Sequence, residues 1–78
     1  MVSGLGQQIY DIMKEYLSET TAGMILKEKC GKISKTPDTI MPEDLKNLVP
    51  LILGSVLLFG GEEKAQKVKE EFAELGIT

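Results

Sequence analysis

The segment from Glu43 to Phe59 constrains this chain most, because it has a helical pattern and is apolar on almost every side. Pro42, Glu43 and Asp44 have the signature of a helix start, with proline in the first turn and acids facing the positive end of the helix dipole. Ten of the fifteen positions from Leu45 to Phe59 are apolar. A helix of this kind belongs in the centre of a core, in a membrane or in an oligomer interface.

Helical periodicity divides this apolar segment into a core face and two surplus flanks. Leu51 and Leu58 lie on one flank, and Leu53 and Leu57 lie on the other. The apolar stretch of about 12 residues is shorter than the ~20 that a spanning helix needs, so we expect no membrane span. The face predicted to be buried consists of Leu45, Leu48, Val49, Ile52, Val56 and Phe59.

Two further features of the segment affect its shape. Pro50 lacks a backbone donor and is predicted to kink the helix or to separate two helices. Gly54 and Ser55 form a notch of small side chains where another helix can approach closely.

Three other helices are expected around the central one. Apolar residues recur with a period of 3.6 over residues 5–17, after Ser3 as the N-cap. A second helix follows the hydroxyl cluster at residues 18–21 and ends near Gly31, and the polar, proline-containing residues 33–42 form a connection. A last helix covers residues 62–75, with Ala65, Val68, Phe72 and Leu75 on its buried stripe. The predicted fold is therefore all-α: one domain over residues 1–78, with about four helices around the apolar, Pro-kinked helix at 43–59.

Composition argues against most catalytic chemistry. The chain has no His, no Arg and no Trp, so the usual general base and transition-metal ligand are absent. Cys30 is the one cysteine; it cannot close a zinc site or an internal disulfide, and we interpret it as a packing residue in a reducing cytoplasm. No signal peptide is visible at the N-terminus. We expect a non-enzymatic protein that holds no metal or cofactor.

Charge patterning gives two weaker candidates. The acids Asp11, Glu15 and Glu19, and a second group at residues 70–74, are interpreted as solvated acidic faces. The net charge of −3 argues against a dedicated nucleic-acid binder, and sequence-specific readout without Arg is not expected. A possible basic patch for an acidic partner consists of Lys27, Lys29, Lys32 and Lys35.

The apolar surplus suggests two functions. In a chain of 78 residues the free energy gained by burying apolar surface is close to the free-energy cost of ordering the chain. A monomer is therefore only marginally stable, which favours self-association. The first hypothesis is therefore an interaction module, a homodimer whose interface contains Leu51, Leu53, Ser55, Leu57 and Leu58. The alternative is a small-molecule or lipid-type binding domain, whose apolar pocket between helices is lined by Met13, Met24, Met41 and leucine side chains.

Overall fold

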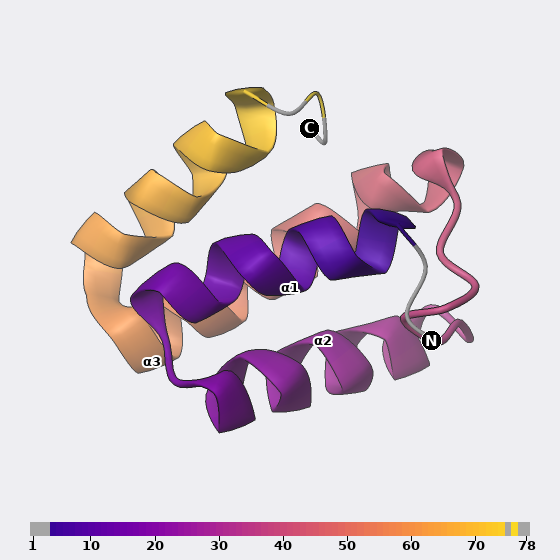
Figure 1. Ribbon diagram of the computed structural model, residues 1–78, viewed down its shortest axis with the longest axis horizontal. Helices are drawn as coiled ribbons and strands as arrows, with labels where there is room; N and C mark the ends of the chain where they lie inside the picture. Colours follow the sequence, from indigo (N-terminus) through magenta and orange to yellow (C-terminus); the bar gives the residue numbers. More distant parts are fainter. Residues whose placement is uncertain (1–3, 75, 77–78) are drawn as a thin grey trace.

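The computed structural model describes residues 4–74 and 76, and it contains helices but no strand within them. The chain forms α1 (Gly4–Tyr16), α2 (Glu19–Lys32), the short 3₁₀ turn η1 (Pro42–Asp44) and α3 (Leu45–Glu74) (Figure 1). The predicted all-α class is confirmed. Ser3 and Leu75, predicted as an N-cap and a buried position, lie outside the described residues.

Three helices pack together, and the expected bundle of about four is not supported. The two predicted helices at 43–59 and 62–75 belong to one element, α3, which changes direction at Gly61. Gly61 has φ 87° and ψ 172°, a combination that is essentially restricted to glycine. The break expected between residues 59 and 62 is therefore a change of direction at a single non-helical residue. We call residues 45–60 the first arm of α3 and residues 62–74 its second arm.

Pro50 does not separate two helices. Gly61 is the position inside α3 with non-helical torsions, and the helix runs through Pro50. Proline removes the hydrogen bond to the carbonyl of Lys46, four residues earlier. Pro50 and Lys46 are both exposed, so water can satisfy that carbonyl.

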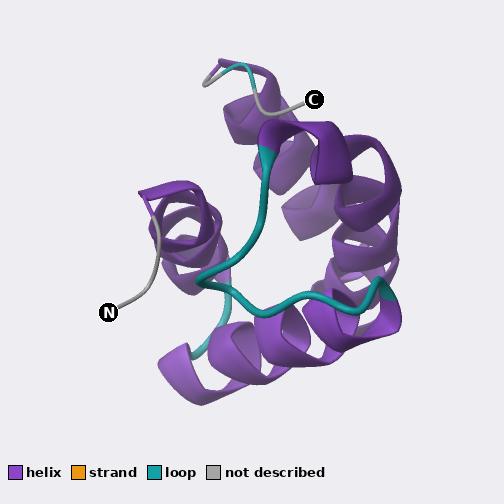
Figure 2. Cartoon of the chain, turned by 90° about the vertical axis from the view of Figure 1, so that its right-hand side faces the viewer, coloured by secondary structure: helices purple, strands orange, loops and turns teal. Residues whose placement is uncertain are grey.

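Side-chain capping and a loop explain the remaining boundaries. Ser18 Oγ accepts a hydrogen bond from the Thr21 backbone N–H (3.1 Å). A hydroxyl residue thus caps α2, which begins at Glu19, inside the cluster at residues 18–21 and not after it. Residues 33–41 form the predicted connection, which crosses one end of the helices before η1 (Figure 2). Ile40 of this loop is buried. The loop therefore closes that end of the core.

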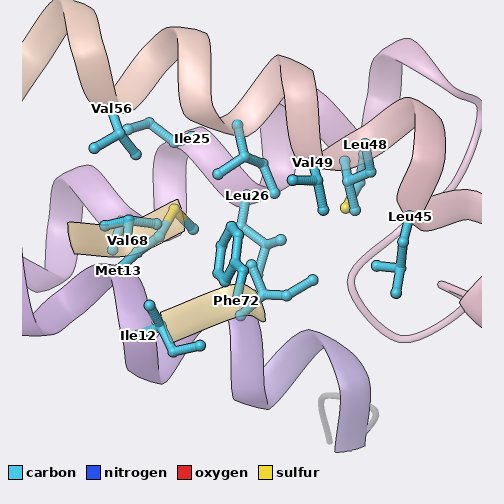
Figure 3. Close-up of a cluster of buried hydrophobic side chains, with 14 of the residues drawn as sticks. Ile12, Met13, Ile25, Leu26, Leu45, Leu48, Val49, Val56, Val68 and Phe72 are labelled. Atoms are coloured by element: carbon cyan, nitrogen blue, oxygen red, sulfur yellow. The ribbon is translucent and has the colours of Figure 1, made fainter. Parts of the chain in front are cut away.

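The core is built from all three helices. The second arm contributes Val68 and Phe72, both fully buried, and Figure 3 shows Phe72 among side chains of the other helices. Five of the six residues predicted for the buried face of the first arm are in the core: Leu45, Leu48, Val49, Ile52 and Val56.

Phe59 is the exception on that face, because it is 55% exposed. Helical periodicity gives the direction in which a side chain points, but it does not say how far neighbouring helices extend. Phe59 lies two residues before the bend at Gly61, at the end of the first arm. The prediction that Phe59 is a core residue is wrong for this reason.

The bend gives a first test. We expect Gly61→Ala to lower the free energy of unfolding by about 1–3 kcal/mol, since alanine is strained at this φ and ψ. The matched control is Gly23→Ala inside α2, where an added Cβ would lie 3.7 Å from Tyr10, an ordinary contact. There we expect a gain of about 0.5–1 kcal/mol. Urea unfolding at one protein concentration measures the change in the free energy of unfolding for each variant. Equal changes at the two positions would contradict the strain argument.

Candidate functional site

Three consecutive large apolar side chains are exposed at the end of the first arm. Leu57, Leu58 and Phe59 are 48%, 80% and 55% exposed; we call them the apolar corner. They precede the bend, where the next helical turn leaves in another direction. Isolated exposed apolar residues are normal, but several at one place mark interaction sites. Because successive helical residues point about 100° apart, the three side chains surround the end of the arm. The apolar corner is therefore the strongest candidate surface.

The five residues of the predicted interface fall into three groups. Leu57 and Leu58 are exposed on the surface. Leu51 and Leu53 are half-buried, and Leu53 packs against the core. Ser55 is only 8% exposed because it lies on the side of the helix that faces the core. Ser55 is thus corrected to a buried residue, and Phe59 is the surface residue that periodicity missed.

A groove of about 690 Å³ runs between the two arms of α3. Leu53, Gly54 and Leu57 form its wall on the first arm. An added Cβ at Gly54 would meet no atom within 4 Å, so the helix surface is open there. The second arm supplies its other wall and a charged rim: Glu62, Glu63, Ala65, Gln66 and Lys69.

A second cavity, of about 580 Å³, lies between α1, α2 and the loop that follows α2; we call it the α1–α2 cavity. Its lining includes Tyr10 of α1 and Leu26 of α2. The predicted methionine-lined pocket does not form in either place. Met13 is fully buried in the core, whereas Met24 and Met41 are about half exposed and line neither the groove nor the cavity.

The four lysines of the predicted basic patch have different surroundings. Lys29 Nζ lies 2.9 Å from the Glu28 carboxylate, and this contact lowers the pKa of Glu28 below its usual value. Lys35 Nζ lies 3.7 Å from Asp44. Lys32 is exposed at the end of α2. The structure brings together Lys27 and Lys35, both of which line the α1–α2 cavity.

Cys30 is a buried thiol, as expected for a packing residue. Its side chain is fully buried in the core. Burial, and then the charge of Asp44, raises the pKa of Cys30 to about 11. A thiol with this pKa is a poor nucleophile at neutral pH.

A polar contact joins α1 to the second arm of α3. The Tyr16 hydroxyl donates a hydrogen bond to the Glu71 carboxylate, which raises the pKa of Tyr16 to about 12. A hydrogen bond to Glu71, together with its charge, also raises the pKa of Glu15. The two predicted acidic faces therefore meet at one point.

Within the described residues, the side chains form no group of three or more acids or cysteines placed to hold a metal ion.

A scan of protein-family models, a search of curated proteins and a search of solved structures each return no match to this chain. The candidate surfaces are therefore assessed from their own geometry.

One helix in the described part of the chain is long and apolar enough to cross a bilayer. The segment Pro42–Glu74 reaches a mean hydropathy of 1.3 over 18 residues, of which 33% are buried. The core helix of a soluble protein has the same properties. Length and composition therefore leave both environments open for α3, in contrast to the expectation from the short apolar stretch.

The burial of Cys30 predicts slow thiol labelling. At pH 8 we expect about one thiol in a thousand to be ionised in the folded chain. Labelling with a disulfide reagent should therefore be slow for the folded protein and fast in guanidinium, where the chain is unfolded. The same rate in both conditions would show that Cys30 is accessible.

The contact between Glu15 and Glu71 predicts a dependence of stability on pH. The raised pKa of Glu15 means that the folded state holds its proton more tightly, so stability falls as pH rises from about 4.5 through the folded pKa. Glu15→Gln should therefore raise the melting temperature at pH 7 and have little effect below pH ~4.

Glu28→Gln is the control of opposite sign. The pKa of Glu28 is lowered by Lys29, so its ionised form stabilises the fold above the unfolded pKa, and this contribution is lost as pH falls. We expect this variant to lower the melting temperature at pH 7. Shifts of the same sign in the two variants would contradict the assignment.

Proposed function

We propose that the chain is a non-enzymatic interaction module that forms a homodimer through the outward face of α3. The observation that carries this proposal is the apolar corner, of which Leu57 and Leu58, 48% and 80% exposed, lie on this face. A reducing cytoplasm suits the protein, because its one thiol is buried and cannot pair within the chain.

The outward face of the first arm is centred on Gly54. At 100° per residue, Pro50 and Leu58 lie four residues before and after Gly54, and Leu51 and Leu57 lie three residues before and after it. All four positions fall on the side of the helix opposite the core residues. Gly54 has no side chain, and the space above it is open. A second helix can therefore approach the backbone closely at this point.

A two-fold axis at Gly54 would pair this face with itself in antiparallel orientation. Pro50 would then meet the partner's Leu58, and Leu51 would meet the partner's Leu57. Such a self-complementary patch is what a two-fold interface requires. Apolar residues lie three and four residues from Gly54 in both directions along the helix. This symmetry favours a second copy of this chain over an unrelated partner.

The proposal is tested by mass measurement with light scattering behind size exclusion. We expect the wild-type chain to elute at about twice 8.6 kDa. Leu58→Glu should raise the dissociation constant more than about a hundredfold, since a two-fold interface loses this side chain twice. The control is Met24→Glu, which places the same charge at a side chain of 48% exposure on α2. A monomeric wild type, or equal dissociation by both variants, would overturn the proposal.

A further inference from the structure

We propose that the α1–α2 cavity binds one molecule of an apolar monocarboxylate, such as a medium-chain fatty acid. The cavity is lined by α1, α2 and the loop after α2, and none of its lining residues belongs to α3. It is therefore distinct from the surface proposed for dimerisation. Its volume of about 580 Å³ falls within the ~300–1,000 Å³ typical of small-molecule sites.

The walls of the cavity are mostly apolar. Tyr10, Leu26 and Pro37 supply them, and both Tyr10 and Leu26 also contact the core. Gly23 stands beside the Tyr10 ring, and Gly31 has open space where a side chain would point. Two glycines on one side of α2 therefore leave room that larger residues would fill. An apolar chain suits these walls better than a sugar or a nucleotide, which need many polar partners.

The charges at the cavity are all positive. Lys27 and Lys35 line it, and no acid does. Lys27 has no carboxylate within ion-pair distance in the described part of the chain, and Lys35 is held only at 3.7 Å by Asp44. The two ammonium groups can therefore face a ligand carboxylate.

The charge balance of the cavity points to a single carboxylate rather than to a phosphate monoester. A phosphate monoester carries about −1.5 to −2 charges at pH 7, whereas a carboxylate carries one. The cavity has two lysine charges, one of which is shared with Asp44. A ligand with one negative charge and an apolar body matches both the lysines and the walls.

The experiment is calorimetric titration of the full chain with decanoate below its aggregation concentration. We expect saturable binding of one decanoate per chain, with decanol and decyltrimethylammonium at least about tenfold weaker because they lack the charge that the lysines attract. Tyrosine fluorescence provides a second readout, since Tyr10 lies in the cavity. In Tyr16→Phe the change in fluorescence should persist, because Tyr16 does not line the cavity.

Variants locate the site. Lys27→Gln with Lys35→Gln should weaken decanoate about tenfold, and Lys32→Gln is the matched control on the same helix, since Lys32 does not line the cavity. Gly31→Leu should abolish binding by filling the space, with circular dichroism showing that the helices remain.

Three results would overturn the inference: no saturable decanoate binding, decanol binding as tightly as decanoate, or unchanged binding in folded Gly31→Leu. Flotation with vesicles of phosphatidylglycerol in the absence of decanoate binding would also overturn it and assign the lysines to a membrane surface. Because Leu58→Glu leaves the cavity intact, decanoate binding by that variant separates this inference from the dimer.

Discussion

Because Gly61 turns α3 back on itself with φ 87°, the second arm reaches the core that α1 shares with the first arm. Val68 and Phe72 are fully buried as a result, and each such side chain contributes ~1.5–3 kcal/mol by leaving water. The contact from Tyr16 to Glu71 then ties α1 to the same arm. Without this reversal, the stripe of the second arm would have no partner, and α1 would be covered on fewer sides.

The same reversal explains why an apolar surface remains. A turn made by one residue leaves Leu58 and Phe59 exposed at the corner, and it leaves Leu57 exposed on the wall of the groove between the two arms. An added Cβ at Gly60 would meet Leu17 at 3.3 Å, so the inner side of this corner is already filled. The side chains that extend outward can be covered only by something outside the chain. The bend thus favours both a closed core and an open apolar surface.

Periodicity predicted the helices and most of the core, because a period of 3.6 depends only on local sequence. It could not show that Phe59 lies at the exposed end of the arm. The same period places Ser55 seven residues after Leu48, on the buried face, so the error there came from treating a small polar side chain as a surface residue. Methionine flexibility, together with a proline kink beside Gly54, predicts a pocket lined by methionines, whereas Met13 fills the core. The α1–α2 cavity joins Tyr10, Lys27 and Lys35 from three segments. No local pattern links such residues, although the glycines of α2 mark the side where space is left.

The two proposed sites share the core but no residue. The groove and the apolar corner belong to α3, and the cavity belongs to α1, α2 and their following loop. Coupling between them would require a ligand to favour one of two arrangements of the core. Core side chains of α2 and of the first arm, such as Ile25 and Ile52, are fully buried, and close-packed interiors resist small continuous shifts. If decanoate does not change the dissociation constant of the dimer, then by reciprocity dimerisation does not change the affinity for decanoate. We therefore expect decanoate affinity to be independent of protein concentration.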